Sequence, residues 1–155
     1  MNKYSFENLR LLLINNKINF EVITHKPVFT MEDVVKELNI PQKVMAKTLI
    51  IDIDDRGLLR IIIPGTTRLD IKKLALIINA SEESIHLADR KTIEQLGFTI
   101  GAIPPFGEDL PTYIDNSFLD QDLLYCGAGD NDKTFSIKPC DIIHLTSATT
   151  IHIPL

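Results

Sequence analysis

Apolar side chains recur at helical spacing near the start of the chain. Phe6, Leu9, Leu12 and Leu13 lie three, three and one positions apart, which predicts a helix over residues 5–16. Other helices are expected where a capping residue precedes an apolar repeat. These begin at Thr30 and run through Leu38, begin at Asp70, and run from Asp89 to a stop at Gly97.

Runs rich in β-branched residues alternate with these helical patterns. The runs 44–53 and 58–63 are joined by Asp54-Asp55-Arg56-Gly57, which is typical of a β-hairpin. Other strands are expected at 20–24, 85–87, 112–114, 123–126 and 134–137. Because helices and strands alternate while hairpin links also occur, the pattern favours an α+β fold with a mixed sheet over a doubly wound parallel sheet.

Composition is that of a single globular domain. No internal repeat or linker divides the 155 residues, of which 45% are hydrophobic and 24% charged, so one domain spanning residues 1–155 is expected. A domain of this size can fold without a disulfide or a structural metal, so Cys126 and Cys140 can be free thiols. No apolar run approaches the ~18 residues of a membrane helix and no signal peptide is evident, which predicts a cytoplasmic protein without a membrane partner.

Net charge limits the partners of the chain. A formal charge of -5 and an isoelectric point near 5.3 argue against broad nucleic-acid binding, which needs a basic face. DNA is not expected as a partner, and an RNA would contact only a small local patch.

One lysine interrupts an apolar strand. Lys47 follows Met45 and Ala46 and precedes Thr48, in a run that is otherwise suited to burial. A cation there is unfavourable unless its ammonium reaches water, a carboxylate or a ligand phosphate. Two interpretations follow: a functional cation, or a lysine near a strand end whose ammonium extends to solvent.

Two glycine-containing segments are candidates for pocket walls. Gly101–Gly107 holds two glycines and two prolines, which allow close approach of a ligand and leave N–H groups free for an oxyanion. The same segment also fits a rigid connector between a helix and a strand. Gly127–Asp132 follows an expected strand and either lines a pocket or forms a hairpin turn.

Metal-ligand patterns are lacking in the sequence. The four histidines show no pair at metal-ligand spacing, and neither C-x-x-C nor H-E-x-x-H occurs, so no metal or other cofactor is expected. A thiol hydrolase would need Cys126 or Cys140 beside an imidazole in space, an arrangement that the sequence leaves open.

Several short blocks occur together in one order. The blocks are His25–Thr30, Met45–Leu49, Ile63–Gly65 with Arg68–Asp70, Gly101–Gly107, Tyr113–Asp115 and Gly127–Asp130. In their order and chemical character the chain resembles the YbaK-like aminoacyl-tRNA deacylases, a family related to the editing domain of prolyl-tRNA synthetase. Each block alone is a weak pattern, and their joint occurrence makes the resemblance specific.

The resemblance implies a mixed, strongly curved β-sheet flanked by helices, with a pocket between the sheet and its loops. It implies hydrolysis of the ester of a mischarged tRNA. Lys47 would anchor the terminal phosphate or stabilise the transition state, and the G-x-x-x-P loop from Gly101 to Pro105 would orient the ester. The terminal hydroxyl of the tRNA would help to activate water. Substrate contacts are expected from His25, Phe29, Met45, Thr48, Ala102, Ile103, Asp115, Ser117, Gly127, Ala128 and Gly129.

Some of these roles compete with simpler ones. His25, Phe29 and Met45, and Asp115 with Ser117, could equally serve packing or capping. Related sequences often carry a histidine in or just after the Gly-Ala-Gly segment, where this chain has Asp130 and Asn131. That difference puts histidine-dependent discrimination of the amino acid in doubt.

The expected partner is the acceptor 3′ end of a mischarged tRNA. A synthetase or elongation factor would then supply tRNA specificity, because the acidic chain offers few cations. Two alternatives stay open: a non-catalytic module that binds an aminoacyl or nucleotide ligand, and a thiol hydrolase that uses Cys126. The patch that would contact tRNA consists of Lys43, Lys47, Arg68, Lys72 and Lys73.

Overall fold

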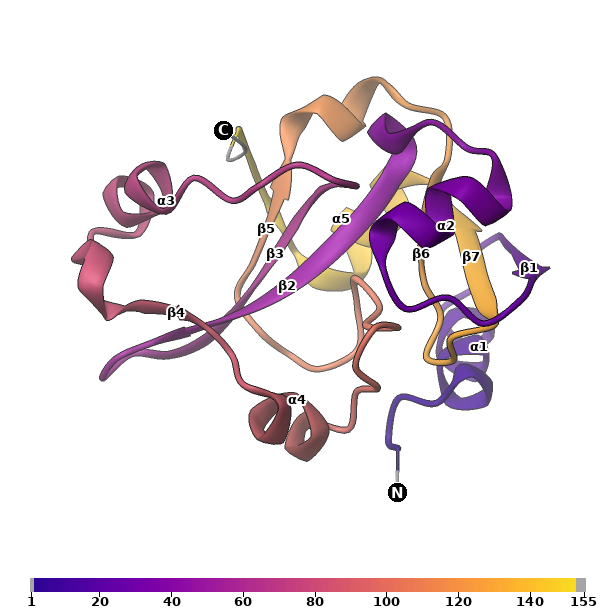
Figure 1. The fold of residues 1–155 in the computed structure, drawn as a ribbon, viewed down its shortest axis with the longest axis horizontal. Helices are drawn as coiled ribbons and strands as arrows, with labels where there is room; N and C mark the ends of the chain where they lie inside the picture. The colour runs from indigo at the N-terminus through magenta and orange to yellow at the C-terminus, as the bar shows by residue number, and fades with distance from the viewer. Residues whose placement is uncertain (1, 153–155) are drawn as a thin grey trace.

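A computed structural model describes residues 2–152 of the chain (Figure 1). Its α-helices are α1 (Phe6–Asn15), α2 (Met31–Leu38), α3 (Ile71–Ile78), α4 (Arg90–Leu96) and α5 (Pro139–Thr146). Its strands are β1 (Phe20–Thr24), β2 (Met45–Ile53), β3 (Gly57–Pro64), β4 (Ile85–Leu87), β5 (Thr112–Asp115), β6 (Leu124–Gly127), β7 (Lys133–Ile137) and β8 (Thr149–Ile151). Short 3₁₀ segments cover Gln42–Val44, Glu82–Ser84 and Asn116–Asp120.

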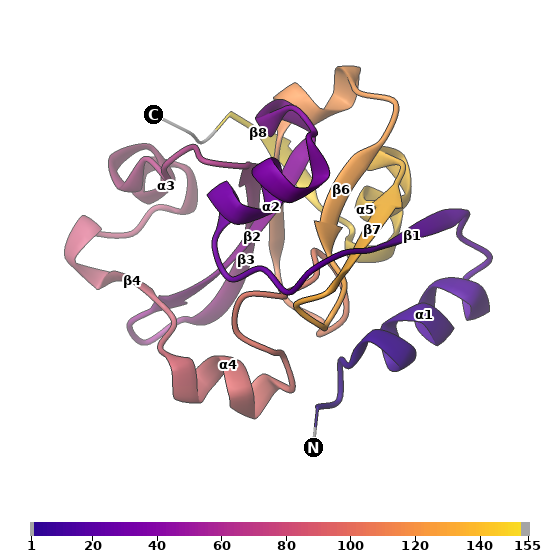
Figure 2. The ribbon, with the colours of Figure 1, turned by 45° about the vertical axis from the view of Figure 1, so that its right-hand side comes forward.

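All eight strands form one mixed sheet. The order is β1-β7-β6-β2-β3-β5-β8, and β4 pairs with the C-terminal end of β2, at Ile51–Ile53. The pairs β1/β7, β6/β7, β2/β3 and β2/β4 are antiparallel, whereas β2/β6, β3/β5 and β5/β8 are parallel. Figure 2 shows the twist of this sheet from β1 to β3. The expected α+β class with a mixed sheet is confirmed.

Side-chain caps fix the starts of the helices, as the sequence predicts. The side chains of Ser5, Thr30, Asp70 and Asp89 each accept a hydrogen bond from a backbone N–H three residues later. Such a bond satisfies a donor that the first turn leaves without a helical partner. Helix α4 ends at Gly97, whose φ of 95° is a left-handed conformation that glycine adopts without strain.

The central strands β2 and β3 are buried on both faces of the sheet, and a separate hydrophobic cluster lies on each face. The larger cluster joins α1, α4 and α5 to one face, where Ile50 of β2 points. The smaller packs α3 against the other face, where Ile51 and Ile53 point. Helix α2 has no buried residue, so it lies over the sheet as an outer element beside β2 and β6 (Figures 1 and 2).

The sequence did not predict helix α5, the 3₁₀ segments or strand β8, which pairs with β5. Most other predicted strands differ from the structure by one residue at an end; β1 and β4 match. No helix in the range 2–152 is both long and apolar enough to cross a membrane.

Candidate functional site

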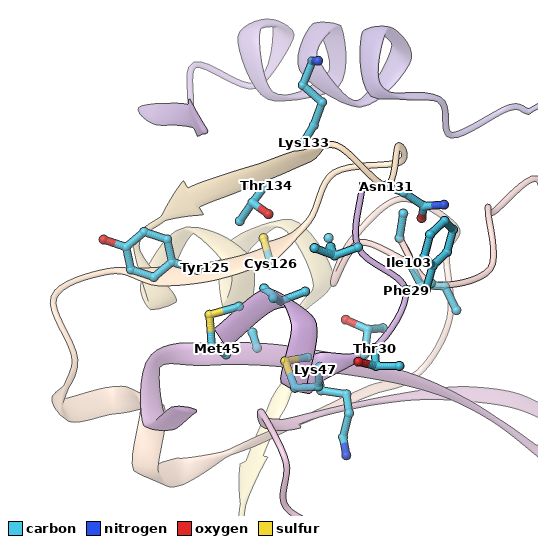
Figure 3. Close-up of a pocket in the computed structure, with 18 of the residues that line it drawn as sticks. Phe29, Thr30, Met45, Lys47, Ile103, Tyr125, Cys126, Asn131, Lys133 and Thr134 are labelled. Atoms are coloured by element: carbon cyan, nitrogen blue, oxygen red, sulfur yellow. The ribbon is translucent and has the colours of Figure 1, made fainter. Parts of the chain in front are cut away.

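A cavity of about 220 Å³ opens where the start of β2 meets β6, β7 and the segment that leads into α2 (Figure 3). It lies beside the parallel pairing of Met45 with Tyr125 and of Ala46 with Cys126. Residues far apart in the sequence therefore share one wall. The lining residues are Val28, Phe29, Thr30, Met31, Val34, Met45, Ala46, Lys47, Thr48, Gly101, Ala102, Ile103, Tyr125, Cys126, Gly127, Asp130, Asn131, Lys133 and Thr134.

Lys47 lies at the rim of this cavity and is half-buried. Its ammonium donates a hydrogen bond to the carbonyl oxygen of Thr67 at 2.5 Å, and in Figure 3 it points away from Cys126 and Thr134. Burial lowers the pKa of Lys47, Glu32 opposes that shift and Arg68 adds to it. An ammonium has three N–H donors, and the other two find no acceptor within the described range, so they are available to a ligand.

A tight turn places the G-x-x-x-P loop against the cavity. The N–H of Ala102 donates to the carbonyl of Thr99 at 3.1 Å, and Gly101, the third residue of the turn, has a φ of 85°. These are the features of a type II turn, which requires glycine at that position. Gly101, Ala102 and Ile103 line the cavity, whereas Pro105 is buried behind it. The N–H groups of Gly101 and Ile103 donate to no other residue in the range 2–152.

The segment Gly127–Asp132 forms a hairpin turn and also lines the pocket, so the two roles considered for it from the sequence do not exclude each other. It connects the antiparallel strands β6 and β7, while Gly127 also lines the cavity. A Cβ atom on Gly127 would lie 2.4 Å from the carbonyl oxygen of Ile103. The N–H of Gly129 donates to the carbonyl of Ala102 at 3.0 Å, and Ala128 is fully buried. The two glycine segments therefore hold each other in place.

Four more of the expected contact residues border or approach the cavity. Phe29 is 70% exposed at its rim, Met45 is buried, and the buried hydroxyl of Thr48 has no hydrogen-bond partner among the described residues. His25 does not line the cavity; its Nε2 lies 2.8 Å from the hydroxyl of Thr134, which does.

Asp115 and Ser117 lie together but outside the cavity lining. The Asp115 carboxylate accepts hydrogen bonds from the backbone N–H and the hydroxyl of Ser117, and it lies 3.0 Å from Nδ1 of His152. The carboxylate thus caps the 3₁₀ segment that follows β5.

Sequence reasoning named neither Thr134 nor Arg60 as a site residue. Thr134 lines the cavity, and so does Asn131 of the candidate segment Gly127–Asp132, whose side-chain oxygen is buried without a partner among the described residues. Arg60 is almost fully buried in β3 and donates to the carbonyl of Glu108 at 2.5 Å and to the hydroxyl of Thr112 at 3.2 Å. Burial lowers its pKa to about 10. Arg60 thereby fixes the segment that follows the G-x-x-x-P loop. In the sequence, the sign of this role is a charged residue within an apolar strand.

The family model of the aminoacyl-tRNA editing domain matches residues 25–145. The chain belongs to this family. The match covers the cavity, both glycine segments and Lys47, and it begins at His25, immediately after β1. The resemblance inferred from the sequence blocks is confirmed.

Relatives of this editing-domain chain include parts of larger proteins. The proline–tRNA ligase of Persephonella marina is 31% identical over 153 residues, which cover 94% of this chain but only 27% of the ligase. An Enterococcus faecalis protein with the provisional name Cys-tRNA(Pro)/Cys-tRNA(Cys) deacylase EbsC is 29% identical over 119 residues, 75% of this chain and 71% of EbsC.

The editing-domain fold is also found in solved structures. A crystal structure reported under the provisional description of a trans-editing enzyme for prolyl tRNA synthetase aligns with a TM-score of 0.86 at 20% identity. The alignment covers 97% of this chain and 96% of that one. At this identity the likeness establishes the fold.

Chemically, the site of this editing-domain chain offers a cation, free backbone donors and buried hydroxyls. No group of three or more metal-ligating side chains occurs within residues 2–152. Cys126 lines the cavity, but burial raises the pKa of its thiol well above the usual range. Since the thiolate is the nucleophilic form, this environment disfavours the thiol-hydrolase alternative.

Alkylation distinguishes the two cysteines. Treatment with iodoacetamide at neutral pH is expected to modify exposed Cys140 and to leave buried Cys126 unmodified, with ester hydrolysis retained. Peptide mass spectrometry locates the modification, and a Cys140→Ser variant should stay unmodified. Alkylation of Cys126 in step with lost hydrolysis would restore the thiol mechanism.

Proposed function

We propose that this chain is an aminoacyl-tRNA deacylase that acts in trans on mischarged tRNA. The observation that carries the proposal is the cavity shared by Lys47 and the Gly101 turn, inside a segment that matches the editing-domain family over residues 25–145. The deacylase name of EbsC supports the same reaction. The sheet, which includes strands from β1 to β8, supports one domain over residues 1–155.

The reaction needs little machinery, because an aminoacyl ester is already reactive. Water attacks the ester carbonyl, a tetrahedral oxyanion forms, and the bond to the ribose oxygen breaks. The ribose oxygen takes up a proton, and the products are the free amino acid and the tRNA. The protein has to hold the ester, admit one water and stabilise the charge on the carbonyl oxygen.

Lys47 supplies that positive charge in our proposal. Its ammonium is held by Thr67 at the rim and retains N–H groups for the terminal phosphate or the oxyanion. Partial burial strengthens its interaction with an anion, because the surroundings screen charge less than water does. The lowered pKa of Lys47 records the same desolvation.

The Gly101 turn supplies backbone donors. The central peptide of a type II turn is flipped relative to a type I turn, and Gly101 permits that conformation. In our proposal the N–H groups of Gly101 and Ile103, which have no partner within the described range, point at the ester oxygen. Pro104 and Pro105, both buried, keep the loop stiff behind them.

The proposed substrate is the acceptor end of a tRNA, which implies a cytoplasmic site of action. A net charge of -5 leaves little basis for contact with the tRNA body, so the patch of Lys43, Lys47, Arg68, Lys72 and Lys73 would carry the interaction. The relationship to proline–tRNA ligases makes a synthetase a candidate partner, with an elongation factor as the other.

A panel of charged tRNAs tests the activity. The purified chain is expected to release amino acid from one or more of the alanyl, seryl, threonyl, cysteinyl and prolyl tRNAs, measured by loss of radiolabelled ester. Small amino acids are the best candidates, because a synthetase pocket excludes a smaller substrate poorly. Tight binding of these tRNAs without any hydrolysis would instead favour a non-catalytic binding module.

A further inference from the structure

Thr134 of β7 is a buried hydroxyl in the cavity wall that is hydrogen-bonded to a histidine. It is 4% exposed, and its oxygen lies 2.8 Å from Nε2 of His25, a residue 109 positions earlier. Nδ1 of His25 lies 2.7 Å from the carbonyl oxygen of Lys26. The backbone N–H of His25 donates to the carbonyl of Asp132 at 2.9 Å, which ties the backbone at His25 to the β6–β7 turn.

These contacts determine which imidazole nitrogen carries the proton. A carbonyl oxygen only accepts hydrogen bonds, so Nδ1 of His25 must be the donor toward Lys26. In a neutral imidazole the other nitrogen is then an acceptor. The short contact to Thr134 is therefore a bond in which the threonine hydroxyl donates and Nε2 of His25 accepts.

The consequence is a hydroxyl with a fixed polarity toward the cavity. Threonine has one O–H donor and two acceptor lone pairs, and here the single donor is used by His25. Only lone pairs of Thr134 remain for a ligand. An unsupported threonine could rotate and serve as a donor or as an acceptor, so His25 converts an adaptable group into a selective one.

Resting on the function proposed above, we propose that Thr134 accepts a hydrogen bond from a donor on the amino-acid part of the substrate, with His25 as its positioning residue. Such a donor is the α-ammonium group, which every aminoacyl ester carries, or a side-chain thiol or hydroxyl. An ester without a donor at this place leaves the buried lone pairs of Thr134 unpaired, and sites of this kind reject such analogues.

Two buried acceptors among the described lining residues differ in how they are held: the side-chain oxygen of Asn131 has no partner there, whereas the hydroxyl of Thr134 is held by His25. Asp130 is the single carboxylate among the described lining residues and it is exposed, so water competes for it. The Thr48 hydroxyl is buried without a partner among the described residues and can donate or accept. In Figure 3 Thr134 and Cys126 lie on the same side of the cavity, opposite the Lys47 ammonium. The ester is thus placed between an acceptor wall and a cationic rim.

Pairs of esters that differ only in a donor test the proposal. Alanyl-tRNA and 2-methylpropanoyl-tRNA differ by the α-ammonium, which a methyl group replaces. Cysteinyl-tRNA and 2-aminobutyryl-tRNA differ by the thiol. Wild-type kcat/KM is expected to be higher for the donor member of each pair, and the pair whose ratio depends on Thr134 identifies the donor.

Variants connect that preference to the two residues. Thr134→Val keeps the shape and should lower the ratio of kcat/KM within that pair at least about tenfold relative to wild type, whereas Thr134→Ser should retain it. His25→Phe should reduce the ratio, because the freed hydroxyl can then rotate. Ser136→Ala is the matched control: Ser136 is a buried hydroxyl two residues further along β7, outside the cavity lining, and its loss should leave the ratio unchanged.

The same acyl groups attached as 3′-amides of 3′-amino-3′-deoxyadenosine cannot turn over as esters, and their binding is measured by calorimetry. A preference in binding that Thr134→Val abolishes supports the proposal even if no ester is hydrolysed, in which case only the deacylase function fails. Wild-type hydrolysis with an unchanged ratio in Thr134→Val or in His25→Phe overturns the Thr134 proposal and leaves the deacylase function standing. If wild type neither binds nor hydrolyses any member, both proposals fail.

Discussion

Replacing Lys47 with alanine is expected to lower kcat/KM for ester hydrolysis about a hundredfold or more, in a protein that stays folded. Removing one preorganised donor to a developing oxyanion typically costs about 3 kcal/mol of transition-state stabilisation. The ammonium lies at the cavity rim and its main contact is a single carbonyl, so the fold depends little on it. Single-turnover hydrolysis of a cleared aminoacyl-tRNA measures the effect, and circular dichroism confirms folding.

Two further variants separate a specific role from a change in net charge. Lys91→Ala removes an exposed cation on α4, outside the cavity lining, and should leave hydrolysis unchanged. Lys47→Arg keeps the charge but replaces a compact ammonium with a planar fork, so it should also lose activity. Wild-type rates in a folded Lys47→Ala protein would remove Lys47 from the mechanism.

Local patterns in the sequence were sufficient for most helices and for the central hairpin. Thr30, Asp70 and Asp89 cap their helices through neighbours three residues away, and Asp54–Gly57 connects two adjacent strands. Such features depend on a few consecutive residues, so the sequence displays them directly.

Elements with a weak local signal were missed. Helix α5 starts with Pro139, but Lys138 provides no side-chain cap, and the helix ends at Ser147 in a left-handed conformation without a glycine. Strand β8 pairs in parallel with β5, from which it is separated by more than thirty residues. Parallel pairing depends on contacts between residues far apart in the sequence, and no local pattern of residues within the strand indicates it.

The candidate site shows the same division. Lys47 and Gly101 were identified from their segments, but their approach to Gly127 depends on the parallel pairing of β2 with β6. Thr134 was missed because its significance comes from His25, at the other end of the chain. Asp115, in contrast, resembles a site residue in sequence while its carboxylate caps the turn that follows β5.

Replacing Gly127 with alanine is expected to disable the site through the backbone alone. The added Cβ would lie 2.4 Å from the carbonyl oxygen and 2.8 Å from the carbonyl carbon of Ile103. These are main-chain atoms that cannot rotate away, so the Gly101–Pro105 loop has to move. Overpacking of this kind costs about 1–3 kcal/mol, and a displacement near 1 Å in a catalytic loop can lower the rate about a hundredfold.

Gly57→Ala is the matched control for that experiment. Gly57 has a φ of 96°, so alanine there is strained by about 1–2 kcal/mol, yet no atom lies within 4 Å of the added Cβ. Both variants should therefore lower the melting temperature by several degrees, since about 1 kcal/mol corresponds to roughly 2–4 °C in a chain of this size. Hydrolysis assayed well below both melting temperatures should be lost only in Gly127→Ala. Equal activity of the two variants would mean that contact between the β6–β7 turn and the Gly101 loop does not position the ester. The reaction would then not require the fixed geometry of that loop.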